Sequence, residues 1–309
     1  MVKHKRAGRI LGLGVSIAAV SAVASLLGAS YPAQGQVNAV QPPGVSVGPQ
    51  YDTTHVYVEP GTENAFVRSW EATFGGTNTT PRLADITPTP SAALSTVVLS
   101  PVGSLSVFDF RSGIPYPYGE ERGGDLVSNF NEGVADALRS GASLVVSPYH
   151  DATGRDCIIQ FPGGVDINLY WHTTPPSYPR LVSVPESRVY LDPAPANSFI
   201  SDWLAFSQGH IVTDDRHADG AQIGMPGTAY RAVLISSRFG QTLVIITDGH
   251  LPYPFGRDTT GYAVPNLAAT LVRAKAAGAR TLWGPYYGKA LDTAIVQFPG
   301  GYVAELHQA

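Results

Sequence analysis

The sequence predicts an α+β fold made of repeated units, each with one strand, one helix and three further strands. Three observations support this prediction: an internal repeat, an alternation of strand-like and helix-like patterns, and a composition with 44% hydrophobic but only 14% charged residues. A chain of 309 residues with this much apolar material is long enough for about two domains with real cores. Global disorder is therefore excluded.

The internal repeat is clearest at a Phe-Pro-Gly-Gly element, which begins at Phe161 and again at Phe298. These positions differ by 298 − 161 = 137 residues, and the Pro-Tyr-Pro-aromatic-Gly segments at 115–119 and 252–256 differ by the same number. Because one offset holds over such a length, chance is excluded as its source. The sequence therefore contains two copies of one pattern.

Each copy contains the strand–helix–strand order twice. The segment that begins at His55 matches the one that begins at Arg188, with an offset of 188 − 55 = 133 residues. Trp70 belongs to an apolar stripe with helical spacing, and Gly141 stands where a glycine commonly ends a helix. In the first copy we expect a strand at 55–58, a helix at 63–74, strands at 97–99 and 105–110, a short strand near 126, a helix at 131–140, and strands at 144–146, 157–161 and 165–171.

The start of the chain has the pattern of a secretory signal peptide. A basic head is followed by uncharged residues from 10 to 29, and then by Ala33-Gln34-Gly35 with spacing suited to cleavage. We expect a signal peptide at 1–35, cleaved near residue 35, a flexible segment at 36–50, and a secreted protein, periplasmic or extracellular. The uncharged run is also long enough to span a bilayer, so a retained anchor is the alternative. Its many Ala, Gly and Ser residues favour cleavage.

Charge and cysteine content exclude several classes of protein. The net charge is −4 without a basic stripe, so we expect no nucleic-acid partner. The single cysteine, Cys157, excludes an intrachain disulfide and a CxxC metal site.

Three groups of residues resemble the vicinal oxygen chelate (VOC) superfamily, which contains glyoxalase I, bleomycin-resistance proteins and extradiol dioxygenases. They are His55-Val-Tyr-Val before a helix that ends at Gly75-Gly76, the helix endings Gly141-Ala142 and Gly278-Ala279, and the closing strand at 302–306. The resemblance implies tandem VOC domains at 51–172 and 187–309, joined by a Pro- and Ser-rich linker at 173–186. Each domain is then a pair of βαβββ modules that form a cupped mixed sheet.

The resemblance also implies a metal site inside a cup, with ligands on the first, fourth, fifth and eighth strands of a domain. The residues at these places in the first domain are His55, Asp109, Asp125 and Asn168. Such ligands suit Mn²⁺, Mg²⁺, Fe²⁺ or Ni²⁺. A metal-free site is an equally open alternative. The 2-His-1-carboxylate set is absent, which disfavours a ring-cleaving dioxygenase.

Asp109 is the strongest reason, apart from the resemblance, to expect a site. It lies in an apolar strand, where a carboxylate is costly unless it is paired or bound. The simpler alternatives are that Asp109 pairs with Arg111 or Arg122 and that Asp125 is a turn residue.

In the second domain only Glu305 stands at a ligand position, because the other places hold Arg188, Ile246 and Tyr262. Glu305 is a candidate catalytic base, and an ion pair with Arg188 is the alternative. His250 lies in a loop and is a candidate proton carrier, with a plain surface histidine as the alternative.

Aromatic and polar residues near the cup are candidates for binding an organic ligand. Strand alternation puts Asp166, Tyr170 and His172 on the same face as Asn168. The candidate ligand-binding residues are Tyr116, Tyr118, Asp166, Tyr170, His172 and Tyr253.

Two classes of function follow from the resemblance, and both involve a small organic molecule. The first is a metal-dependent lyase or isomerase similar to glyoxalases, in which the metal polarises vicinal oxygens and a carboxylate moves a proton. The second is a metal-free binding or sequestering protein similar to the bleomycin-resistance proteins. Export argues against chemistry that relies on cytosolic thiols. A purely structural duplicated protein is a third alternative, but it does not explain Asp109.

Overall fold

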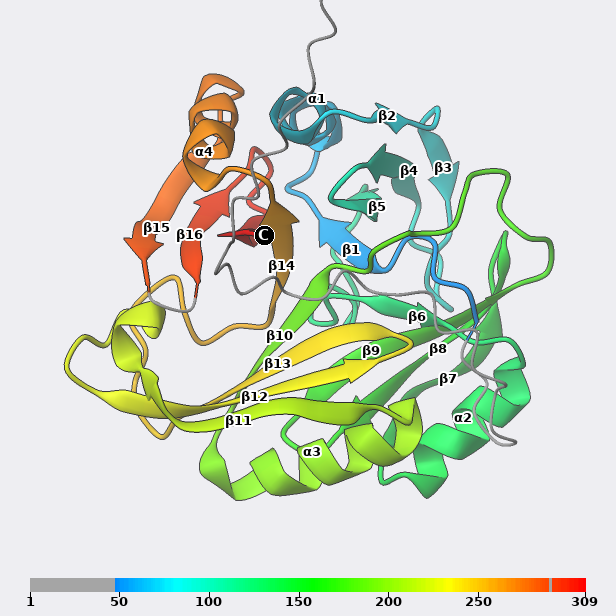
Figure 1. The fold of residues 1–309 in the computed structure, drawn as a ribbon. Coiled ribbons are helices and arrows are strands. Elements are labelled where there is room, and N and C mark those ends of the chain that lie inside the picture. Colours follow the sequence, from blue (N-terminus) through cyan, green and yellow to red (C-terminus); the bar gives the residue numbers. More distant parts are fainter. Residues whose placement is uncertain (1–47, 289–290) are drawn as a thin grey trace, which may run out of the picture. The chain divides into compact units, whose positions relative to one another are not determined.

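The computed structural model describes residues 48–288 and 291–309, which form four successive units of the predicted kind (Figure 1). The first unit comprises β1 (Thr54–Tyr57), α1 (Glu63–Phe74), β2 (Thr77–Asn78), β3 (Arg82–Ala84), β4 (Ala93–Ser100) and β5 (Gly103–Phe110). The second comprises β6 (Gly124–Leu126), α2 (Phe130–Arg139), β7 (Ser143–His150), β8 (Gly154–Phe161) and β9 (Val165–His172).

The second copy repeats this order. The third unit comprises β10 (Glu186–Leu191), α3 (Pro193–Ser207), β11 (His210–Asp219), the short 3₁₀ helix η1 (Gly220–Ile223), β12 (Ala229–Ser237) and β13 (Gly240–Ile246). The fourth comprises β14 (Thr259–Val264), α4 (Leu267–Ala276), β15 (Arg280–Tyr287), β16 (Asp292–Gln297) and β17 (Val303–Gln308). The helix predicted at 63–74 is confirmed residue for residue, whereas the strand predicted at 97–99 is longer in both directions.

In every unit the first strand pairs in parallel with the last, as in β1 with β5 and β6 with β9. The third and fourth units join through antiparallel β10 and β14 into one eight-stranded sheet. The sheets of the first two units are linked by a β-bridge between Thr54 and Gly123, beside backbone hydrogen bonds from Gly124 to Thr53 and from His55 to Arg122. The predicted α+β class with mixed sheets is therefore confirmed.

The two largest apolar cores lie between the two copies of the repeat. One core joins the second and third units and contains Phe161 and Trp203. The other joins the first and fourth units and contains Trp70 and Phe298, with α1 packed against α4 (Figure 1). Each copy thus covers the apolar sheet faces of the other. The domain ranges 51–172 and 187–309 remain a prediction. The two largest cores combine residues of both ranges, whereas a smaller cluster around Phe108 and Phe110 and another around Tyr230 and Ile245 each lie within one range.

The predicted signal peptide and most of the segment predicted to be flexible, 36–50, lie outside the described residues. The described end of that segment is not loose. Gln50 is buried and exchanges hydrogen bonds of 3.0 Å with the backbone of Leu126 in both directions. The linker is anchored as well, because the Leu181 N–H donates to the carbonyl of Gln50.

Within the described residues, the structure contains no helix that combines the length and the apolar character needed to cross a membrane.

Candidate functional site

Each copy of the repeat has one sheet face turned towards the cores and one turned away from them, the cup face. Strand alternation decides which side chains reach each face. In β1, Val56 enters the core, so His55 and Tyr57 lie on the cup face. The cup face of residues 51–172 is the first cup, and that of residues 187–309 is the second cup.

A buried carboxylate, Glu121, organises the first cup. Its Oε1 lies 3.4 Å from Nδ1 of His55 and also accepts a hydrogen bond from the hydroxyl of Tyr57. Burial, followed by the charge of Glu121, raises the pKa of Tyr57 well above its ordinary value. Tyr57 is therefore a permanent hydrogen-bond donor near neutral pH. His55 and Glu121 are 9% and 1% exposed, so this contact is shielded from bulk water.

Several buried side-chain atoms of the first cup have no hydrogen-bond partner among the described residues. They include two oxygens that can only accept, Oε2 of Glu121 and Oδ1 of Asn168, and also the hydroxyl of Tyr170 and Nε2 of His172. Leaving a buried acceptor unpaired costs about 1–3 kcal/mol. The first cup is therefore suited to a bound group that donates hydrogen bonds.

Gly124 brings these groups into one region. It pairs with Asn168 between β6 and β9. A Cβ atom at Gly124 would lie 2.9 Å from Nε2 of His55 and 3.2 Å from Cδ1 of Tyr170. Only a glycine leaves room for both rings, so His55, Asn168 and Tyr170 share one part of the cup.

Further acidic groups surround this region. Asp52 accepts from the hydroxyl of Ser106 and, at 2.9 Å, from the hydroxyl of Tyr178 in the linker segment. Burial, with a contribution from Asp151, raises the pKa of Asp156 well above its ordinary value. A hydrogen bond with the side chain of Asn168 opposes this increase in the pKa of Asp156.

Sequence analysis missed Tyr57, Glu121, Asp52 and Asp156. Strand alternation could have predicted that Tyr57 and Asp156 lie on the cup face, because each lies two residues from another cup-facing residue of its strand. Glu121 carried a weaker signal. It lies in a loop, but its equivalent in the second copy, at 121 + 137 = 258, is also acidic. That residue, Asp258, is bound to the backbone N–H of Tyr190 at 3.0 Å.

The structure does not bring the four predicted metal ligands together. Asp109 lies on the core face with Val107, and both its oxygens accept from the Gly61 N–H, at 3.1 and 2.9 Å. It pairs with neither of the two arginines considered for it. Asp125 belongs to a strand rather than a turn, and it lies on the face of β6 opposite Gly124. Of the four, His55 and Asn168 alone remain in the first cup.

The donor set of the first cup does not fit a resident divalent metal. Across residues 48–288 and 291–309, no three His, Cys, Asp or Glu side chains are grouped so that they could hold a metal ion. His55 and Glu121 supply one imidazole and one carboxylate, whereas catalytic metal sites commonly use three protein ligands.

The second cup holds an ion-pair network instead. Arg188 Nη1 lies 2.7 Å from Oε1 of Glu305, and Nδ1 of His307 lies 2.8 Å from Oε2. Thr293 also donates to Glu305, and Glu186 lies 3.4 Å from Nε of Arg188. The guanidinium stands where a first-strand metal ligand was considered, so this cup does not fit a metal either.

Glu305 is poorly suited to act as a base. Burial raises its pKa, but the charges of Arg188 and His307 more than offset burial and lower the pKa to about 2. The alternative interpretation, an ion pair with Arg188, is confirmed. His250 is exposed in the loop between β13 and β14, and no contact joins it to this network.

The tyrosines of the Pro-Tyr-Pro segments differ in position. Tyr116 and Tyr253 are 75% and 71% exposed, whereas Tyr118 is buried. The two exposed rings are therefore accessible to solvent, and their role in ligand binding remains a prediction. On β9, Tyr170 is buried and forms an edge-to-face contact of 5.2 Å with His172, which extends the first cup.

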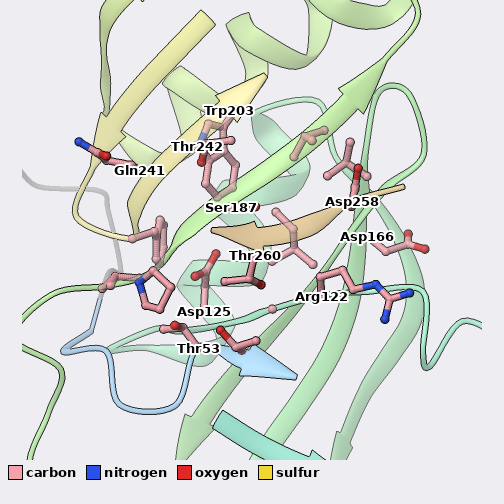
Figure 2. A pocket seen from close by; sticks show the side chains of 18 of the residues that line it. Thr53, Arg122, Asp125, Asp166, Ser187, Trp203, Gln241, Thr242, Asp258 and Thr260 are labelled. Carbon is pink, nitrogen blue, oxygen red and sulfur yellow. The ribbon is translucent and has the colours of Figure 1, made fainter. Parts of the chain in front are cut away.

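A separate cavity of about 70 Å³ lies between the two copies of the repeat (Figure 2). We call it the central cavity. Asp125 and Trp203 approach it from different sides, and Asp166 lies at its edge. Asp166 is half-buried and accepts from Gln160 at 3.0 Å. Apolar walls and hydroxyl groups complete the lining: Val165, Val189, Phe199, Phe239, Thr242 and Thr260.

Solved structures of similar fold support the architecture. A triple mutant of 4-hydroxymandelate synthase from Streptomyces coelicolor is 12% identical, with a TM-score of 0.56 over 84% of this chain and 93% of that chain. The 2,3-dioxygenase LapB from Pseudomonas sp. KL28 is 11% identical, with a TM-score of 0.52 over 86% and 93%. The 2,2',3-trihydroxybiphenyl 1,2-dioxygenase of Sphingomonas wittichii strain RW1 is 12% identical, with a TM-score of 0.52 over 85% and 91%.

No family model and no curated protein matches the chain. At these low identities the similarity concerns the fold. The chain therefore has the vicinal oxygen chelate fold over nearly all of its described length.

Proposed function

We propose that the protein binds a small organic molecule in the first cup, without a resident metal ion. The observation that carries this proposal is the pair of buried acceptors without donors, Glu121 Oε2 and Asn168 Oδ1. A ligand with hydroxyl or amino groups supplies the missing donors. The structures of similar fold include enzymes whose names refer to small organic compounds, which supports a ligand of this size.

Neither cup has the side chains that a metal-dependent lyase or isomerase would need to hold its metal ion. Asp109 and Asp125 point away from His55, and a guanidinium occupies the corresponding part of the second cup. The proposal therefore assigns ligand recognition to hydrogen bonds and aromatic rings.

A ligand screen by thermal shift tests the proposal. Small diols, amines and phenols are added to the purified full chain, and a binder raises the Tm. Glu121→Gln removes one acceptor and adds an amide donor, so it should abolish the shift. Glu120→Gln is the matched control, because Glu120 is its exposed neighbour. Absence of any stabilising compound, or equal binding by the Glu121 variant, would contradict the proposal.

A second candidate function, proton transfer, is favoured by the contact of His55 with Glu121. A carboxylate that holds one ring nitrogen of a histidine orients the other towards a substrate. For a compound found in the screen, proton exchange in D₂O is followed by NMR. His55→Gln should abolish exchange while binding persists. No exchange in the unchanged protein would leave binding as the function.

We also propose that the chain is exported and that its signal peptide is removed near residue 35. The support is the basic head and uncharged run of the sequence. Mass spectrometry of the protein from its native cells should find a first residue near 36. A chain that retains Met1 would contradict this proposal.

A further inference from the structure

The central cavity lies where the second copy of the repeat has a tyrosine. Asp125 and Tyr262 are equivalent positions, because 125 + 137 = 262, and both follow the glycine that faces the cup. Val165 and Tyr302 are likewise equivalent, since 165 + 137 = 302. The core between the first and fourth units therefore contains two tyrosines where the other core contains Asp125 and Val165.

Both tyrosines are buried in their core. Tyr262 is 0% exposed and packs edge-to-face on Trp70, with ring centroids 5.0 Å apart. Its hydroxyl lies 2.9 Å from that of Tyr302, so both phenol groups have a partner. The indole N–H of Trp70 donates to Ser100 at 3.2 Å.

The equivalent tryptophan in the other core borders the central cavity. Trp203 corresponds to Trp70, because 70 + 133 = 203, and it is 3% exposed. Its indole N–H has no acceptor among the described residues. The carboxyl group of Asp125 likewise makes no side-chain hydrogen bond within residues 48–288 and 291–309, and both groups line the central cavity (Figure 2).

From this comparison we propose that the central cavity binds a small aromatic alcohol or phenol, whose ring takes the place that Tyr262 fills in the other core. The ring packs against Trp203, Phe199 and Phe239. The hydroxyl group suits the polar atoms, because one hydroxyl can accept from the indole N–H and donate to Asp125. An ammonium group cannot accept from the indole, which favours a hydroxyl.

The volume of the cavity limits the ligand to one ring. One water molecule needs roughly 10–15 Å³ of such volume, and the cavity has about 70 Å³. It therefore accommodates about five to seven non-hydrogen atoms, and phenol, which has seven, is at the upper limit. This inference is independent of the function proposed for the first cup, because it rests on other residues.

The test uses phenol as the probe and the full chain as the protein. We expect phenol to shift the indole N–H resonance of Trp203 in ¹⁵N-labelled protein, with half-saturation on the order of 1 mM. Trp203→Phe assigns that resonance. Benzene, which lacks the hydroxyl, should bind at least about tenfold more weakly, as expected when a buried polar site loses its partner.

Two variants distinguish phenol binding in the central cavity from phenol binding elsewhere on the protein. Asp125→Tyr combined with Val165→Tyr rebuilds the tyrosine pair of the other core, so it should abolish phenol binding and raise the Tm. Asp125→Ala keeps the cavity open and should lower phenol affinity about tenfold while leaving benzene binding in place.

Three results would overturn the inference. The first is no phenol-dependent shift, as expected for a cavity that holds only water. The second is unchanged phenol binding in the double tyrosine variant. The third is loss of phenol binding in Glu121→Gln but not in Asp125→Ala, which would place the phenol in the first cup.

Discussion

Arg188→Met is expected to lower the free energy of unfolding by about 3 kcal/mol or more. The substitution removes the cation that lies 2.7 Å from Glu305, a carboxylate that is 2% exposed. Removing one partner of a buried pair costs about 3–5 kcal/mol, because a charge remains without compensation.

The structure gives a second route to this magnitude. The pKa of Glu305 is lowered from 4.5 to about 2, and one pKa unit corresponds to about 1.4 kcal/mol. The surroundings of Glu305 thus favour its ionised form by about 3 kcal/mol. Because the folded pKa is depressed, this contribution is complete above pH 4.5 and is lost as the pH falls through 2.

Urea denaturation followed by tryptophan fluorescence measures the effect at constant m value. Arg216→Met is the matched control, because Arg216 is exposed and lies 3.9 Å from Asp214. An exposed pair of this kind contributes about 0–1 kcal/mol. The double variant Arg188→Met with Glu305→Gln removes the stranded charge, so it should recover part of the loss.

The pH dependence is a further check. Without the guanidinium, burial raises the pKa of Glu305, so the deficit of Arg188→Met should shrink as the pH approaches 4. The reasoning would be refuted by a loss below about 1 kcal/mol, by a loss equal to that of Arg216→Met, or by a double variant less stable than the single one.

Three other predictions concern single side chains. The pKa of His307 is raised because the charge of Glu305 outweighs burial; stability should therefore fall as the pH rises above 6.5, and His307→Asn should flatten that decrease in urea titrations between about pH 6 and 8. Burial raises the pKa of Asp125 to about 7, so stability is lost as the pH rises from about 4 to 7; Asp125→Asn should be more stable than the unchanged chain at pH 8 by about 1–2 kcal/mol, and an unchanged pH profile would contradict this. Asp109→Ala should lower stability by about 1–3 kcal/mol, because the Gly61 N–H loses its acceptor; a change in metal content without loss of stability would contradict it.

Local periodicity predicted the order of helices and strands, and the resemblance to the VOC superfamily supplied the cupped sheets. The stripe of Phe66, Val67 and Trp70 is buried as expected, and α1 has the predicted bounds. The repeat supplied the order of all four units, since a pattern supported twice is less ambiguous than one seen once. Periodicity does not predict which apolar face packs against which. For that reason the sequence did not predict that Trp70 packs with Phe298 and Trp203 with Phe161.

The metal ligands were misplaced for a different reason. They were assigned by the order of the strands, and the side of the sheet was not checked. Asp109 has the same parity as Val107, which is in the core, and Asp125 directly follows Gly124. Strand parity alone would have removed both from the cup. The direction of the Glu121 side chain could not be predicted, because a loop has no period from which it can be inferred; the repeat offered only the acidic residue at the equivalent position, Asp258.

Each of the two largest cores combines one unit of the first copy with one unit of the second, and this affects how the two copies can differ. A side chain on a core face packs against both its own copy and the other one. Phe161 and Phe298 are alike at such a position, whereas Val165 and Tyr302 differ, so each core has its own packing. A cup face packs against no other copy, and there His55 and Arg188 differ in charge and chemistry. A cut at Val182, which is 99% exposed, would yield two fragments that each need the other to cover their apolar faces. After duplication the copies thus became obligate partners in folding while remaining free to differ in chemistry.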